Sequence, residues 1–112
     1  MPAETNVYNP EITLLTVPED VTNEAIVEGV GLYPFSSVSV EISGDGEGVD
    51  HLNGSNTTQT DVNGAFGVRV AFGPPPPGPP AQNCTVNVEC SALSASATAY
   101  WDGVDFYNVM KT

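Results

Sequence analysis

Hydrophobic and polar residues alternate with a period of two along much of the chain. The clearest case is 37–43, SVSVEIS, in which Val38, Val40 and Ile42 share one parity. Such a period places successive side chains on opposite faces of a β-strand. The same reasoning predicts strands at 11–17, 24–30, 57–61, 65–72, 83–92 and 94–101, with 102–110 as a last short strand or an exposed tail.

The pattern contains no convincing helix. No window of about 11 residues carries the i, i+3, i+4 apolar stripe of an amphipathic helix. Turn residues rich in Gly, Pro and Asn separate the predicted strands. Seven or eight short strands of this kind predict an all-β fold, an antiparallel β-sandwich.

Two segments between the strands carry turn signals of different kinds. Asn63 and Gly64 form the dipeptide most typical of a β-hairpin, because both tolerate positive φ. This predicts that 57–61, as a polar edge strand, and 65–72 pair with each other. Residues 44–56, GDGEGVDHLNGSN, have four glycines and no strand period, which predicts a long exposed loop.

The strand at 65–72 raises a question about its single cation. Phe66, Val68, Val70 and Phe72 share the face expected to pack in the core, and Arg69 lies on the other face. A cross-strand pair with an acidic residue is the first expectation, worth about 0.2–1 kcal/mol. Contact with a partner is the second, because arginine is enriched at protein interfaces.

The length of 112 residues suits one domain. Residues 1–10 have no period and contain two prolines, so we expect an extended N-terminal arm, followed by a single domain at 11–112. The segment at 73–80, GPPPPGPP, favours polyproline II structure. It is expected to be a stiff connector at the edge of the sandwich, with a docking ligand for an aromatic groove as the alternative.

Charge restricts the classes of partner. The chain has 14 acidic residues against Arg69 and Lys111, a net charge of −12. This disfavours nucleic acid and anionic lipid, because both require cationic side chains. No apolar run reaches the roughly 20 residues of a spanning helix, and the N-terminus lacks the pattern of a secretory signal. We therefore expect neither nucleic acid nor membrane as a partner.

The two cysteines, Cys84 and Cys90, alternate with valines on one predicted strand. Six residues at about 3.3 Å each separate them by roughly 20 Å. A disulfide requires Cα atoms within about 7 Å, so the two are expected to be small buried hydrophobic residues.

Catalytic chemistry is not indicated. The single histidine, His51, lies in the predicted loop, and no Ser-His-Asp set or phosphate-binding glycine loop is present. Asp45, Glu47 and Asp50 supply oxygen ligands suited to Ca²⁺, although their spacing is not that of an EF-hand. The alternative is that these three acids are simply solvated. We predict a non-enzymatic protein with Ca²⁺ as the one candidate cofactor.

Two stretches of turn and strand together resemble a known family. A Gly-rich turn before a proline precedes the alternating valines, and a T-D-x-N-G-x-F stretch leads into the later strand. This resembles the immunoglobulin-like domains of bacterial surface proteins and tailed-phage virion proteins, over roughly 11–101. The matching residues are Gly29, Gly31 and Pro34, then Thr60, Asp61, Asn63, Gly64 and Phe66. The Cys…Trp…Cys pattern of antibody domains is absent.

The resemblance implies an immunoglobulin-like antiparallel β-sandwich that acts as a capsid decoration or cement protein on the virion surface. Its partners would then be the major capsid protein or other virion proteins. Val7 and Tyr8 on the arm, together with Arg69, are the candidate partner contacts. A homo-oligomer is expected, with a trimer as the guess from shell symmetry.

Two other classes remain open. One is a cell-surface adhesion or carbohydrate-binding immunoglobulin-like module, with or without calcium. The other is a small-ligand carrier similar to chromophore-binding bacterial sandwiches, supported only by length and acidity. The paired disulfides of those carriers are not expected here, so this class ranks last.

Overall fold

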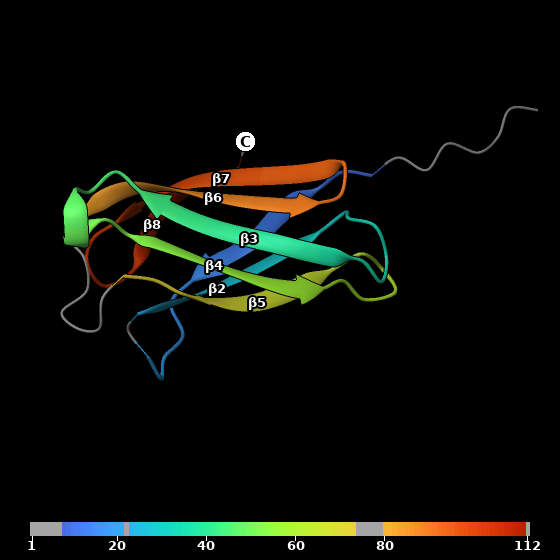
Figure 1. The fold of residues 1–112 in the computed structure, drawn as a ribbon, viewed down its shortest axis with the longest axis horizontal. Coiled ribbons are helices and arrows are strands. Elements are labelled where there is room, and N and C mark those ends of the chain that lie inside the picture. Colours follow the sequence, from blue (N-terminus) through green and yellow to red (C-terminus); the bar gives the residue numbers. More distant parts are fainter. Residues whose placement is uncertain (1–7, 22, 74–79, 112) are drawn as a thin grey trace, which may run out of the picture.

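The computed structural model describes residues 8–21, 23–73 and 80–111. Within them the chain forms two antiparallel sheets, ordered β1-β2-β5 and β4-β3-β6-β7-β8, that face each other as the layers of a sandwich (Figure 1). The strands are β1 (Glu11–Thr16), β2 (Glu24–Val30), β3 (Ser37–Gly44), β4 (Asn53–Gln59), β5 (Phe66–Ala71), β6 (Gln82–Cys90), β7 (Leu93–Trp101) and β8 (Phe106–Lys111), with one 3-10 turn, η1 (Gly48–Asp50). The predicted all-β sandwich is confirmed, and its architecture is compatible with an immunoglobulin-like domain.

The period of two decides which side chains form the core. In β3 the predicted residues Val38, Val40 and Ile42 are buried, and in β5 the predicted Phe66 and Val70 are buried. Each such side chain contributes about 1.5–3 kcal/mol through burial. The core also holds three aromatic rings that contact one another: Trp101 on β7, Phe106 on β8 and Phe72, which follows β5. Trp101 lies 5.0 Å from Phe72 and 4.7 Å from Phe106 between ring centroids.

The two cysteines behave as predicted. Cys84 and Cys90 are both free and buried on β6. Burial raises the pKa of the Cys84 thiol to about 11, so this group is a neutral, inert part of the core at physiological pH.

The hairpin prediction is wrong about strand pairing. The turn itself forms: the Asp61 carboxylate accepts hydrogen bonds from the N–H groups of Asn63 and Ala65, and Gly64 has φ of 76°. However, β4 pairs with β3 and β5 pairs with β2. The turn therefore carries the chain from one sheet to the other. The local turn chemistry is the same whether the two flanking strands pair with each other or lie in different sheets. The Asn-Gly signal therefore did not distinguish a hairpin from a connection between sheets.

The long loop predicted at 44–56 is shorter than expected. Strand β4 begins at Asn53, where its polar composition hid the extended structure, and its whole length pairs with β3. It is an edge strand, as predicted for 57–61. Gly54 lets β4 approach β5, because a Cβ at this position would stand 2.0 Å from the Ala71 carbonyl oxygen. The amide of Asn56 also donates to the Arg69 carbonyl oxygen at 2.8 Å, so these two sheet edges lie side by side (Figure 1).

Several predictions concern segments that the structure does not describe. Most of the N-terminal arm (1–7) and most of the proline-rich segment (74–79) lie outside the described residues.

The segment predicted at 102–110 as either a last short strand or a tail contains a strand, β8. Among the described residues no helix has the length and hydropathy to cross a membrane.

Candidate functional site

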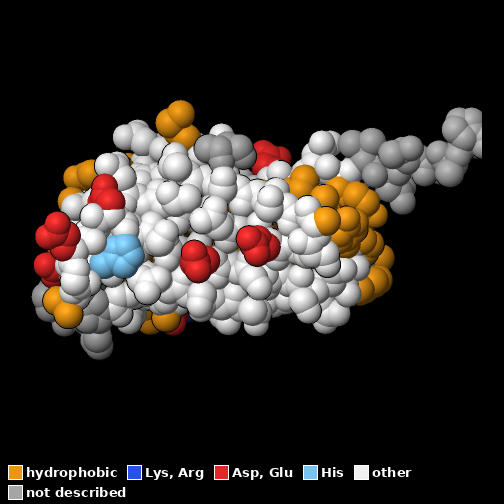
Figure 2. Space-filling model, turned by 45° about the horizontal axis from the view of Figure 1, so that its top comes forward, with side chains coloured by type: hydrophobic (Ala, Val, Ile, Leu, Met, Phe, Trp, Pro, Cys, Tyr) orange, Lys and Arg blue, Asp and Glu red, His pale blue; other side chains and the backbone are white. Residues whose placement is uncertain are grey.

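One end of the sandwich gathers exposed apolar side chains. The loop between β2 and β3 and the turn between β4 and β5 meet there, since the Leu32 N–H donates to the Gly64 carbonyl and the Phe35 N–H donates to the Asp61 carbonyl, both at 3.2 Å. Figure 2 shows hydrophobic side chains concentrated at this end. We call Tyr8, Tyr33, Pro34, Phe35 and Val62 the apolar end.

Phe35 and Val62 are both strongly exposed at the apolar end. Their exposed fractions are 65% and 63%. A hollow of about 440 Å³ lies beside them, lined in part by Tyr8, Leu32 and Val62. The Tyr8 ring meets the Tyr33 ring edge-on with centroids 4.7 Å apart. The described part of the arm therefore packs against the apolar end through Tyr8. A partner that contacts the apolar end would also contact this part of the arm.

A buried hydroxyl fixes the loop that presents Phe35. Thr60 is 3% exposed, and its Oγ1 accepts from the Ser36 N–H at 2.8 Å and donates to the Tyr33 carbonyl at 2.6 Å. Its backbone N–H donates to the Ser36 carbonyl at 2.9 Å. The loop is held by these hydrogen bonds on both sides of Phe35, so its shape does not depend on burying the Phe35 ring.

The backbone of Phe35 is itself unfavourable. Its φ is 51°, in the left-handed region. This region costs an L-residue with a large side chain about 1–2 kcal/mol, and strained residues of this kind concentrate at functional positions. A residue whose backbone is strained and whose aromatic ring is exposed contributes little to folding. The combination identifies Phe35 as a candidate contact residue.

The opposite end of the sandwich carries the acidic loop at 45–52. Gln82 is 5% exposed and fixes this loop: its Oε1 accepts from the N–H groups of Gly46 and Leu52, and its Nε2 donates to the Asp50 carbonyl. Leu52 is fully buried. We call the described residues 17–21, 45–52 and 102–105 the acidic end. The exposed acids of this end are Glu19, Asp20, Asp45, Glu47, Asp50 and Asp102.

The calcium prediction for Asp45, Glu47 and Asp50 stays a prediction. Asp45, Glu47 and Asp50 are exposed, and η1 turns the chain between them. Within the described part of the chain, no group of three or more His, Cys, Asp or Glu side chains is placed to hold a metal ion. His51 lies against the loop backbone, with Nδ1 3.1 Å from the Gly46 carbonyl oxygen.

Arg69 has the acidic partners that the sequence suggested. Its guanidinium lies 3.1 Å from the Asp20 carboxylate and 3.4 Å from that of Glu24, which is on the neighbouring strand β2. The hydrogen bond from Arg69 lowers the pKa of Asp20. The Arg69 side chain remains half exposed, so its predicted role in partner contact stays a prediction. Of the other two candidates, Tyr8 is half-buried at the apolar end and Val7 lies outside the described residues.

Sequence reasoning missed Phe35 and Val62. Both are apolar residues in turns, and the strand period assigns such positions to neither face. The available signal was their neighbours: Phe35 follows Pro34, and Val62 lies within T-D-V-N-G. A large apolar residue at the centre of a turn is exposed unless the loop folds back, and that observation alone would have marked both.

Comparisons with known proteins assign no family. No protein-family model matches the sequence, and no curated protein sequence matches it. Among solved structures, macromomycin matches over 92% of this chain and 96% of its own, with 12% sequence identity and a TM-score of 0.39. A likeness this distant indicates neither family nor function.

Proposed function

We propose that this protein is a non-enzymatic attachment protein, a decoration or cement subunit of a virion with an immunoglobulin-like sandwich. It docks on the protein shell through its apolar end and presents its acidic end outward. The observation that carries this proposal is Phe35, exposed and held at positive φ beside Val62. The viral assignment is supported by the turn and strand motifs that resemble phage virion domains.

The distribution of charge favours docking by the apolar end. In the described loops of this end, 8–10, 31–36 and 60–65, Asp61 is the one charged residue. Contact there removes few charges from water, and the central part of a protein interface is depleted in charge. The acidic end has the opposite property, because its like charges repel neighbouring copies and keep that end solvated.

The proposed partner is the major capsid protein or another virion protein. A shell presents symmetric sites, so the bound state we propose is a homo-oligomer, with three copies around a local three-fold axis. The arm reaches this same contact through Tyr8. The proposed location is therefore the virion surface.

The first test is composition. Virus particles from the source culture, purified by density gradient, are expected to contain the chain in many copies per particle by quantitative mass spectrometry. Particles that never contain it would end the proposal.

The second test locates the docking end. Particles lacking the chain are mixed with purified protein, and bound protein is measured by co-sedimentation. Val62→Ser and Phe35→Ala are expected to weaken binding at least tenfold, as loss of a hot-spot residue does. Val104→Ser is the matched control: Val104 is 70% exposed but lies at the acidic end, and this variant should bind normally. Equal weakening by the control would contradict docking through the apolar end.

A further inference from the structure

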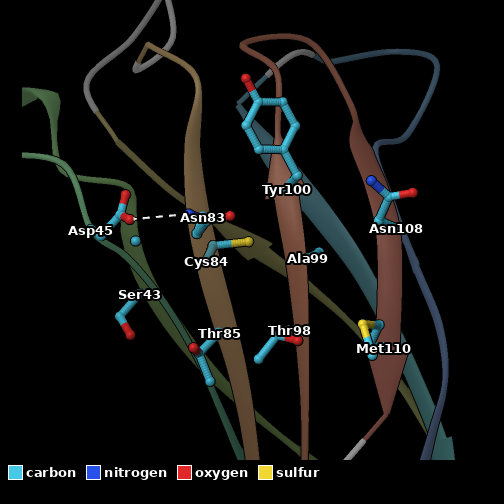
Figure 3. A pocket seen from close by; sticks show the side chains of 11 residues that line it. Ser43, Asp45, Asn83, Cys84, Thr85, Thr98, Ala99, Tyr100, Asn108 and Met110 are labelled. Atoms are coloured by element: carbon cyan, nitrogen blue, oxygen red, sulfur yellow. Dashed lines mark hydrogen bonds between the residues drawn. The ribbon is translucent and has the colours of Figure 1, made fainter.

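The outer face of the five-stranded sheet carries a hollow of about 530 Å³ (Figure 3). It lies over β6, β7 and β8, beside the end of β3. Along β6 and β7 the residues that line the hollow alternate between buried and exposed. Cys84 and Ala99 are buried, while their strand neighbours Asn83, Thr98 and Tyr100 are exposed. The side chains used below are Asp45, Asn83, Thr85, Thr98, Tyr100 and Asn108.

A β-bulge shapes this hollow. Thr98 is opposite Met110 and Tyr100 is opposite Tyr107, so Asn108 and Val109 both face Ala99 across the pair β7-β8. Asn108 has φ of 54°. A bulge of this type bends the strand and redirects its side chains. In Figure 3, β8 carries Asn108 and Met110 along one side of the hollow, and Tyr100 stands at its upper end.

We infer that this hollow binds a neutral carbohydrate. Tyr100 is 41% exposed and offers a flat apolar ring for the C–H face of a sugar. The amides of Asn83 and Asn108 and the hydroxyls of Thr85 and Thr98 supply both donors and acceptors, as sugar hydroxyls require. The hollow therefore combines one aromatic surface with several polar side chains that can serve the hydroxyl groups of a sugar.

At least one polar side chain of the hollow is held in place before a ligand binds. Asn83 Nδ2 lies 3.4 Å from the Asp45 carboxylate, an interaction drawn in Figure 3. Tyr107, directly opposite Tyr100, is 51% exposed. The two tyrosines form an exposed cross-strand pair at one end of the hollow. A second sugar unit has a surface there, so an oligosaccharide fits better than a monosaccharide.

Charge excludes the anionic alternatives. Neither cation of the chain lines the hollow: Arg69 is paired with Asp20 and Glu24, and Lys111 is paired with Glu11 at 2.7 Å. Asp45 lies on the rim. A phosphate, a sulfate or a sialylated glycan would approach a negative surface without a counter-charge. The ligand is therefore an uncharged sugar chain.

The test is a titration of the ¹⁵N-labelled protein with neutral hexaoses built from glucose, mannose or N-acetylglucosamine, and with sialyllactose as the anionic probe. At least one neutral hexaose should shift the amides of Asn83, Thr98 and Tyr100, while sialyllactose should not. No shift with any neutral hexaose at about 10 mM, a concentration that detects binding weaker than 1 mM, would overturn the inference. A stronger response to sialyllactose would overturn it as well.

Two variants separate this site from the docking end. Tyr100→Ala should weaken sugar binding about tenfold, because the stacked ring loses both burial and its aromatic contact. Phe35→Ala removes an exposed aromatic ring at the other end and should leave sugar binding unchanged. In the particle-binding assay, Phe35→Ala should weaken binding and Tyr100→Ala should leave it unchanged. If Tyr100→Ala keeps its melting temperature and still binds the sugar as wild type does, the assignment of this hollow is wrong.

Discussion

The two ends of the sandwich are built by the same device but present opposite surfaces. At each end a buried polar side chain holds the loops through hydrogen bonds to backbone groups: Gln82 at the acidic end and Thr60 at the apolar end. At the acidic end Leu52 is fully buried, and Val49 of the same loop is 80% exposed next to the acids Glu47 and Asp50. At the apolar end Phe35 points outward, 65% exposed.

The difference shows that exposure of Phe35 is not a consequence of a loose loop. A loop held by hydrogen bonds on both sides of a residue has a defined direction for that side chain. The acidic end shows that a loop held in this way can bury one apolar residue, Leu52. The apolar end instead keeps a ring in water on a backbone with φ of 51°. Folding gains little from this arrangement, which is why we propose a docking role for it.

Removing the buried amide of the acidic end should have the largest effect on stability. Gln82→Ala leaves the N–H groups of Gly46 and Leu52 and the Asp50 carbonyl without their partner. Unsatisfied buried groups cost about 1–3 kcal/mol each, so we expect the free energy of unfolding to fall by about 3 kcal/mol. Urea denaturation measures this change through the midpoint at constant slope.

Asn87→Ala is the matched control for that variant. Asn87 is an exposed amide on the same strand, β6. Its replacement should change the free energy of unfolding by less than about 0.5 kcal/mol, as is usual for surface positions. A similar loss in both variants would mean that the strand, rather than the Gln82 hydrogen bonds, holds the acidic end.

The sandwich was predictable because its signal is local. Val38, Val40 and Ile42 alternate with small polar residues, and this period alone assigns them to the core. The pairing of β4 with β3 was not predictable in this way. Asn53 and Gly54 have low strand preference, and their extended conformation depends on β3 on one side and on the close approach of Ala71 on the other. Contacts between distant segments leave no period in the sequence.

The candidate site was less predictable than the fold. Arg69 was found because a lone cation on an apolar strand is conspicuous, and its pairing with an acid on a neighbouring strand is confirmed by Glu24. Phe35 was missed because the strand period assigns a turn residue to neither face, and the hydrogen bonds that fix its loop come from Thr60, which lies 25 residues further along the chain. A residue pattern around Phe35 contains no trace of that constraint.

Loosening the loop of the apolar end should have an intermediate effect. Thr60→Val keeps the shape of the side chain but removes the hydroxyl that bonds the Ser36 N–H and the Tyr33 carbonyl. We expect a loss of about 1–2 kcal/mol by urea denaturation. Particle binding should weaken although Phe35 is intact. Thr58→Val, two residues earlier on β4, should change neither quantity, and unchanged particle binding by Thr60→Val would show that a fixed loop is unnecessary.

Relieving the strain at Phe35 should act in the opposite direction. Glycine tolerates φ of 51°, so Phe35→Gly is expected to raise the free energy of unfolding by about 0.5–1 kcal/mol, after the entropy that glycine adds to the unfolded chain. Phe35→Ala removes the ring but keeps the strain, and should lack this gain. Both should lose particle binding. A glycine variant less stable than the alanine variant would show that the backbone of Phe35 is not strained.

The smallest effect is expected where the acidic end meets its cation. The Arg69 side chain and its partner Asp20 are both at least half exposed, and exposed pairs contribute little to stability. Arg69→Met should therefore shift the melting temperature only slightly at pH 7. Lys111→Met, which breaks the pair with Glu11, serves as a control for removing a cation elsewhere.

The informative quantity for Arg69→Met is how that small difference depends on pH and salt. Arg69 lowers the pKa of Asp20 from its usual 3.8, so the pair stabilises the folded state above that pH and loses this contribution as the pH falls through the lowered value. The melting curves of wild type and Arg69→Met should separate near neutral pH, converge in acid and also converge at high salt, where exposed charges are screened. A difference that persists in acid and at high salt would come from packing of the arginine stem instead. The Arg69 side chain would then hold the edge of β5 through its apolar stem. The acids of the acidic end would not depend on Arg69 as a counter-ion.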